Sequence, residues 1–164
     1  MSEQKLYIDY MDTPVGELEI VSNTQHLLSV LFVKTEKNTL DKQPVLESEI
    51  NQETKKQLDA YFKKELTQFN LPLHPAGTDF QKSVWTELTK IPFGLTISYL
   101  TLAKKLGDPN SIRAAASANG KNPITIIIPC HRVIGADGKL VGYSGDMWRK
   151  QWLLNLESKQ ESLF

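Results

Sequence analysis

Apolar and polar residues alternate along the first third of the chain. The apolar positions are Leu6, Ile8 and Tyr10, then Leu18 and Ile20, and then Leu28, Val30 and Phe32. A period of two is typical of strands that bury one face. Pro14-Val15-Gly16 and Ser22-Asn23-Thr24 supply residues that favour turns between these strands. The pattern predicts a small antiparallel sheet with one face on a core.

From about Glu47 to Phe69, the spacing of the apolar residues is that of a helix. One face of this helix carries Leu58, Tyr61, Phe62, Leu66 and Phe69, and the opposite face carries lysines. Residues 70–77 contain two prolines and a glycine and are typical of a linker. We therefore predict a sheet-plus-helix domain over residues 1–72 and a second domain over residues 73–164.

Three helices are predicted between the linker and Gly120. Thr78-Asp79-Phe80-Gln81 is a capping box that starts the first helix, with Thr78 as its N-cap. The inward stripe of this helix is expected to hold Phe80, Val84, Trp85 and Leu88. The second helix ends at Gly107, and its apolar face holds Tyr99, Leu102, Ala103 and Leu106. The third helix has Asp108 as N-cap, Pro109 at its first position and Gly120 at its end.

The second and third of these helices, joined by Gly107-Asp108-Pro109, form a candidate helix-turn-helix. An αα-hairpin with no role in nucleic-acid binding is the alternative. After Arg113 the third helix carries only small side chains, from Ala114 to Ala118. A helix this smooth can approach a narrow minor groove closely, although close packing on another helix would require the same residues.

A run of β-branched residues from Ile124 to Ile128 predicts a buried strand, which Pro129 closes. Turn residues at 137–138 and 142–145 indicate a loop or wing. A last helix, with Asp146 as N-cap, reaches Glu157. Its inward side chains are expected to be Trp148, Trp152, Leu153 and Leu156.

Cys130 is the only cysteine, which excludes an internal disulfide and a zinc site built on several thiolates. The three histidines are far apart and show no metal-ligand spacing, so no metal or cofactor is expected. The chain has no run of about eighteen apolar residues, and its first residues lack the apolar core of a signal peptide. These features favour a cytoplasmic protein that does not bind membranes.

The net charge of zero conceals a division between the two halves. Residues 1–77 carry 8 lysines against 12 acidic residues, and residues 78–164 carry 11 basic residues against 7 acidic ones. The second half, with a net charge of +4, is therefore the half in which to seek a surface that contacts phosphates.

The residues around Cys130 leave two interpretations open. A single cysteine after an isoleucine run is commonly a small buried apolar side chain. On the other hand, Pro129 ends the run, so the thiol can face a cavity, and His131 and Arg132 supply a base and a positive charge. A thiol needs such surroundings to ionise at neutral pH.

A resemblance to a known family bears on this choice. Residues 128–133 read Ile-Pro-Cys-His-Arg-Val and match the I/V-P-C-H-R-V signature of the O6-alkylguanine-DNA alkyltransferases. Further likeness, in the same order, lies in residues 12–16, 78–85, 91–94, 97–99, 119–123, 142–145 and 149–154, together with Glu157. The resemblance implies an α+β fold, with an RNase H-like N-terminal domain and a C-terminal domain whose helix-turn-helix is of the winged-helix type.

It also implies a function, namely DNA repair by stoichiometric transfer of an alkyl group from O6-alkylguanine, and from O4-alkylthymine, to Cys130. In the family pattern Cys130 is the nucleophile, His131 takes its proton through a water, and Glu157 orients His131. Asn122 shapes the pocket, and Tyr99 donates toward the departing purine. The reaction needs no cofactor.

The implied partner is double-stranded DNA, bound by a monomer through the minor groove with the damaged base flipped out. Arg113 would enter the space that the base leaves. The backbone near Val133 and Ser144 would read the base edge. Further DNA contacts are assigned to Tyr143, Ala114, Ala115 and Ser117.

Two positions depart from the family pattern. Ala115-Ala116 stands where the family has Val-Gly, and Asp146 stands where it has a second glycine. Three other functions remain to be distinguished. A lesion-binding relative would lack Cys130, a Cys-His hydrolase would turn over repeatedly, and a regulator would use the helix-turn-helix alone. Outside the resemblance, Tyr99 fits a core position and Arg113 a solvated one.

Overall fold

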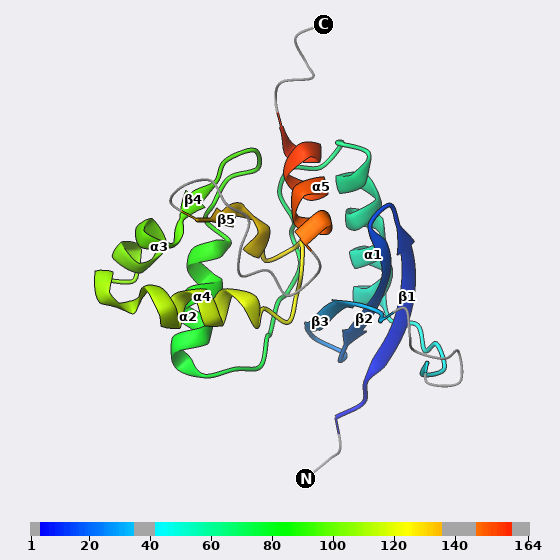
Figure 1. Cartoon of the computed structure of the whole chain (residues 1–164). Coiled ribbons are helices and arrows are strands. Elements are labelled where there is room, and N and C mark those ends of the chain that lie inside the picture. Colours follow the sequence, from blue (N-terminus) through cyan, green and yellow to red (C-terminus); the bar gives the residue numbers. More distant parts are fainter. Residues whose placement is uncertain (1–3, 35–41, 136–146, 159–164) are drawn as a thin grey trace, which may run out of the picture. The chain divides into compact units, whose positions relative to one another are not determined.

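The first part of the chain forms the predicted antiparallel sheet. In the computed structural model its strands are β1 (Tyr7–Thr13), β2 (Gly16–Ser22) and β3 (Leu27–Phe32), in the order β1-β2-β3 (Figure 1). The structure describes residues 4–34, 42–135 and 147–158. At the turn between β1 and β2, Gly16 has φ 121°, a backbone conformation that glycine adopts without strain.

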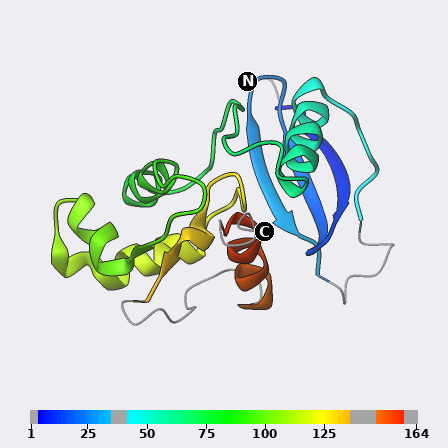
Figure 2. The ribbon, with the colours of Figure 1, turned by 90° about the horizontal axis from the view of Figure 1, so that it is seen from above.

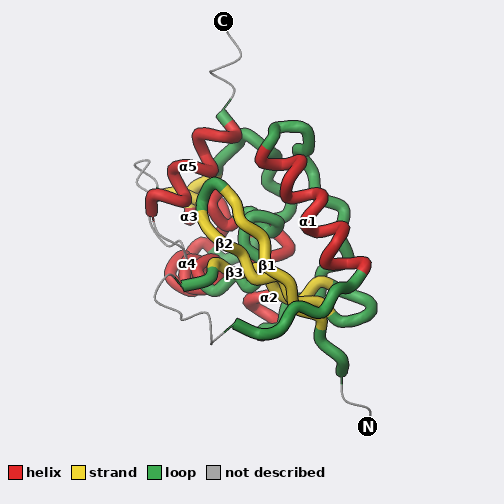
Figure 3. The backbone as a smooth tube through the Cα atoms, turned by 90° about the vertical axis from the view of Figure 1, so that its right-hand side faces the viewer, coloured by secondary structure: helices red, strands yellow, loops and turns green. Residues whose placement is uncertain are grey.

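Helix α1 (Glu49–Phe62) lies along this sheet (Figures 2 and 3). It buries Leu58 and Tyr61 and is capped by Ser48, whose side chain accepts from the backbone N–H of Asn51. The expected extension to Phe69 is wrong. The helix stops because the backbone turns at Lys64, which has φ 62°.

Two polar contacts fasten α1 to strand β1. Asp9, a buried residue, forms an ion pair with Lys55 across 3.0 Å. The side-chain Nδ2 of Asn51 donates to the carbonyl oxygen of Tyr7 across 3.0 Å. β1 therefore differs from the expected pattern, because Asp9 is more buried than its apolar neighbours, and Leu6 is exposed.

The segment after α1 returns to the sheet before the first compact unit, residues 1–76, ends. The backbone N–H of Leu27 donates to Pro72, and that of His74 donates to Leu27, at 2.7 and 2.9 Å. The boundary expected from the sequence, between residues 72 and 73, falls inside this paired segment.

The second unit, residues 77–164, starts with α2 (Asp79–Leu88). Both hydrogen bonds of the predicted capping box between Thr78 and Gln81 are present. The buried stripe consists of Val84, Trp85 and Leu88. Phe80 was expected in that stripe but is 38% exposed, because the first turn of the helix lies at the edge of the packed region.

The predicted helix-turn-helix follows. It consists of α3 (Tyr99–Lys105), a 3₁₀ turn η2 (Pro109–Ser111) and α4 (Ile112–Gly120). Asp108 caps the turn by accepting from the backbone of Asn110 at 2.9 Å, and Gly107 takes a φ of 93°. Helix α4 packs against both α2 and α3, and the indole N–H of Trp85 donates to the carbonyl oxygen of Ala118.

The expected strand at residues 124–128 is wrong, although its burial is confirmed. The backbone forms a tight turn instead, in which the N–H of Ile128 donates to Ile124 across 3.0 Å and Ile126 has φ 72°. Short strands β4 (Ile97–Ser98) and β5 (Val133–Ile134) pair in parallel, and the 3₁₀ turn η3 (Cys130–Arg132) precedes β5.

The last helix, α5 (Met147–Glu157), buries Lys150, Leu153 and Glu157. Trp148, which was expected to point inward, is 51% exposed, because the buried face carries the two charged residues instead. The expected wing and the N-cap Asp146 lie outside the described residues. None of the described helices has the length and apolar character needed to span a bilayer.

Candidate active site

Cys130 lies at the start of η3, directly after the buried turn. Its exposed fraction is 0%, so the thiol, which was expected to face a cavity, is closed off from solvent. Asn122 holds the turn that carries it. The Asn122 side chain donates to the carbonyl oxygen of Ile128 across 2.7 Å and accepts from the N–H of Ile124 across 2.9 Å. The local sequence favours a strand, and these two bonds impose a turn.

His131 and Glu157 meet in the interior of the second unit. The imidazole Nε2 of His131 lies 2.7 Å from Oε2 of Glu157, and both side chains are buried. In an extended segment, the side chains of Cys130 and His131 would point to opposite faces. The 3₁₀ turn removes this constraint and lets His131 reach Glu157. The structure therefore brings together the two residues that the family pattern links to the nucleophile.

Arg132 serves the carboxylate of Glu157 and not the sulfur. Its Nε and Nη2 donate to the two oxygens of Glu157 at 2.8 and 3.0 Å, and its Nη1 donates to the carbonyl oxygen of Ile91 at 2.6 Å. Such a two-point ion pair has a fixed geometry. The expectation that Arg132 provides the positive field at Cys130 is therefore wrong.

These contacts set the charges of the pair. Burial raises the pKa of Glu157, but the hydrogen bonds and charges of His131 and Arg132 outweigh burial and lower the pKa to about 2. Burial lowers the pKa of His131 below its ordinary value, against the opposing effect of Glu157. At neutral pH we infer a carboxylate beside a neutral imidazole, with the imidazole hydrogen on Nε2.

The other imidazole nitrogen, Nδ1, can act as a proton acceptor. Among the described residues, Nδ1 of His131 is buried and has no hydrogen-bond partner. In the tautomer inferred above, this atom carries the lone pair of the ring. A buried acceptor next to a cysteine in the chain is suited to receive a proton, directly or through a water.

The cation beside Cys130 is Lys150, which the sequence analysis missed. Lys150 is 0% exposed, and its Nζ donates to the carbonyl oxygen of Val133 across 2.6 Å. Burial lowers the pKa of Lys150 to about 8, while the nearby Cys130 acts to raise it. Burial raises the pKa of Cys130, and Asn122 and Lys150 oppose this rise. The spacing of Lys150 from Glu157, two helical turns, was the available signal.

Tyr99 completes the group around the sulfur. It is the first residue of α3 and is buried, and the ammonium of Lys150 lies 5.9 Å from the centre of its ring. Burial and Cys130 raise the pKa of the phenol to about 12, so the phenol keeps its hydrogen at neutral pH. The expected residues Tyr143 and Ser144 lie outside the described part of the chain.

One face of α4 is open to solvent. It presents Arg113, Ala114 and Ser117, three of the residues assigned to DNA contact. The side chain of Ala115, which was also assigned to DNA contact, is 0% exposed and packs inside the second unit.

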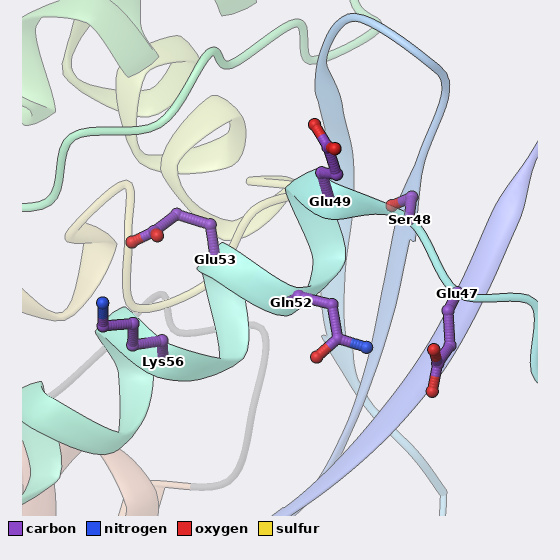
Figure 4. A pocket seen from close by; sticks show the side chains of 6 residues that line it. All are labelled: Glu47, Ser48, Glu49, Gln52, Glu53 and Lys56. Atoms are coloured by element: carbon purple, nitrogen blue, oxygen red, sulfur yellow. The ribbon is translucent and has the colours of Figure 1, made fainter.

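A polar hollow of about 590 Å³ lies on the first unit, at the start of α1. Figure 4 shows the residues that line it, which are Glu47, Ser48, Glu49, Gln52, Glu53 and Lys56. Three carboxylates against one ammonium would repel the phosphates of a nucleic acid. The buried group around Cys130 is therefore the stronger candidate.

The comparisons with known proteins agree with this choice. Two family models match the chain: the ribonuclease-like domain of 6-O-methylguanine DNA methyltransferase over residues 6–75 and its DNA binding domain over residues 79–159. A methylated-DNA–protein-cysteine methyltransferase of Methanosarcina barkeri is 44% identical over 153 residues, which are 93% of this chain and 97% of the relative. The protein of the same name from Mycobacterium leprae is 43% identical, over 92% of this chain and 91% of the relative.

Two solved structures show the same architecture. The O6-methylguanine methyltransferase of Mycobacterium tuberculosis superposes with a TM-score of 0.84 at 40% identity, over 93% of each chain. The OGT protein of the same organism, in complex with DNA, has a TM-score of 0.82 at 42% identity over 92% of each chain. This chain therefore belongs to the 6-O-methylguanine DNA methyltransferase family.

Proposed function

We propose that this protein repairs DNA by moving the alkyl group of an O6-alkylguanine, or an O4-alkylthymine, onto the sulfur of Cys130. The observation that carries the proposal is the buried pair of His131 and Glu157 next to Cys130, with Nδ1 of the imidazole open. Membership of the family and the DNA-bound structure of a relative support it.

The reaction begins with the thiol. Its proton passes to Nδ1 of His131, through one water, and Glu157 stabilises the imidazolium that forms. The ammonium of Lys150 and the amide of Asn122 stabilise the thiolate, because both lower the pKa of Cys130. These groups offset part of the cost of forming a charge in a buried place.

The alkyl transfer is a displacement at carbon. The thiolate sulfur forms a bond to the alkyl carbon while the carbon–O6 bond breaks, and the electron pair of that bond goes to the purine. The phenol of Tyr99 donates a hydrogen toward the purine and reduces the charge that develops there. The net result is a thioether on Cys130 and a guanine that has gained one proton, which balances the proton that the imidazolium gives up when His131 returns to its neutral form. Because a thioether has no easy hydrolytic exit, each molecule acts once.

The DNA must bring its damaged base to the sulfur. Extrusion from the duplex costs a few kcal/mol, and Arg113, exposed on α4, offsets this cost by filling the vacated space. The small residues Ala114 and Ser117 on the same face let the helix lie close to the minor groove. Because Cys130 is buried, the segments that cover it must move to admit the base. We include in the proposal that a monomer performs this reaction in the cytoplasm.

The test is a titration with a duplex that carries one radiolabelled O6-methylguanine. We expect label to appear on the protein up to one equivalent and then stop, with no label on Cys130→Ser. Glu157→Gln should slow the transfer by ~100-fold, because the base loses its orienting carboxylate. Continued release of labelled product beyond one equivalent would point to a hydrolase and contradict the proposal.

A further inference from the structure

The C-terminal end of α4 carries a second asparagine beside the site, Asn119, to which the chemistry above assigns no part. Its side chain is fully buried. Its Nδ2 donates to the backbone carbonyl oxygen of Cys130 across 3.3 Å. This bond links the helix that presents Arg113 to the peptide unit of the nucleophile.

Asn119 also hydrogen-bonds the phenol of Tyr99. Burial and Cys130 raise the pKa of this phenol, and the bond from Asn119 acts to lower it. Among the described residues the amide Oδ1 of Asn119 has no hydrogen-bond partner, so this bond is made by Nδ2 as donor, and the phenol oxygen is its acceptor. A hydroxyl oxygen that accepts a hydrogen bond from an amide does not point its own hydrogen at that amide. The O–H of Tyr99 is therefore directed away from Asn119.

We propose that Asn119 is a positioning residue for alkyl transfer: its amide joins the Cys130 peptide to the Tyr99 phenol and aims the phenol hydrogen at the departing purine. The inference rests on the proposed function, because it assumes that Tyr99 donates during the displacement. One NH₂ group has two hydrogens in a fixed geometry, so a single side chain sets the distance between the nucleophile and the donor. Errors of ~1 Å in such distances can cost ~100-fold in rate.

The test is a double-mutant cycle with Tyr99, measured as single-turnover transfer from O6-benzylguanine. Asn119→Leu keeps a similar volume and removes both donors. We expect its limiting rate to fall by ~10-fold, with the half-saturating concentration unchanged, because the hydrogen bonds act on the displacement step. Added to Tyr99→Phe, the same substitution should slow transfer by less than ~2-fold, since the phenol through which it acts is absent. Equal slowing in both backgrounds would overturn the proposal.

Asn51→Leu is the matched control. Asn51 is also a fully buried helical asparagine, and its Nδ2 donates to the carbonyl oxygen of Tyr7 in the first unit. We expect it to lower the thermal midpoint as Asn119→Leu does and to leave the limiting rate unchanged. Slowing of the same size in both variants would mean that lost stability explains the effect, and the proposal would fail.

Three further outcomes are distinguishable. If Asn119→Leu does not fold, Asn119→Met enters the same cycle with the same expectation and the same contradicting result. If the unmodified chain transfers no benzyl group at all, the proposed function itself fails. If it transfers the group but the cycle is additive, only the role of Asn119 is lost.

Discussion

Nε2 of His131 lies 2.7 Å from Oε2 of Glu157, and Arg132 holds the same carboxylate through two donors. Both partners of Glu157 precede it by about two dozen residues and lie on η3. The carboxylate is thus fixed from the same short turn that carries the nucleophile. Any movement of η3 changes the base and its support together.

Glu157 should make the protein lose stability in acid. Its pKa is about 2 in the folded protein against an ordinary value of 4.5, so folding favours the ionised form. This contribution is fully present above pH 4.5 and is lost as the pH falls toward 2, with a total on the order of 3 kcal/mol. Urea unfolding at a series of pH values measures it. Glu157→Gln should flatten this part of the curve, and an unchanged slope in the variant would contradict the assignment.

Lys150→Met should slow transfer most at low pH. The ammonium lowers the pKa of Cys130, so its removal reduces the thiolate fraction, by on the order of 10-fold in rate at pH 7. The difference should shrink above pH 8, where Lys150 itself loses its proton and the thiol ionises more fully. Single-turnover rates with O6-benzylguanine between pH 6 and 9 test this. Lys90→Met, at an exposed lysine, is the control and should not differ from the unmodified protein.

Arg113→Ala should separate duplex repair from the chemistry. We expect repair of O6-methylguanine in duplex DNA to slow by ~10-fold or more, because the extruded base is no longer replaced in the stack. Transfer from free O6-benzylguanine should be unchanged. Lys82→Ala removes a charge from an exposed position on α2 and controls for net charge. Equal losses on the two substrates would exclude a role for Arg113 in base extrusion.

Replacing either of two neighbouring alanines on α4 with a larger residue should have a different effect, one on stability and the other on DNA binding. Ala115→Leu overfills a fully buried position and should cost about 1–3 kcal/mol of unfolding free energy. Ala114→Leu, on the exposed face, should leave stability within about 0.5 kcal/mol. It should weaken duplex binding, because the helix can no longer approach the groove closely. Urea unfolding measures the effect on stability, and fluorescence anisotropy with a labelled duplex measures the effect on binding. A loss of stability in Ala114→Leu but not in Ala115→Leu would refute the orientation of α4.

Local signals in the sequence were sufficient for much of the fold. Alternation predicted the three strands of the first unit. The capping box at Thr78 and the cap at Asp108 predicted where helices begin, because both depend on residues close together in the chain. The identity of Cys130, His131 and Glu157 as a group came from the family signature and not from their spacing.

The failures have a common physical cause. The run from Ile124 to Ile128 has a strand composition, but the Asn122 side chain donates one hydrogen bond to this run and accepts another from it, and the two bonds bend the run into a turn. In the sequence, Lys150 resembles a surface lysine. Only the folded structure shows that Lys150 is buried beside Cys130, whereas Trp148, which was expected to be buried, is exposed. In each case a contact in the folded protein overrides a local preference.

The most direct measurement is mass spectrometry of the tryptic peptide 122–132, which contains Cys130, after incubation with a duplex that carries O6-methylguanine. The account predicts one added methyl group, located on the sulfur, and none after incubation with undamaged duplex. A methyl group on another residue, or an unmodified peptide from a protein that has consumed the lesion, would contradict it.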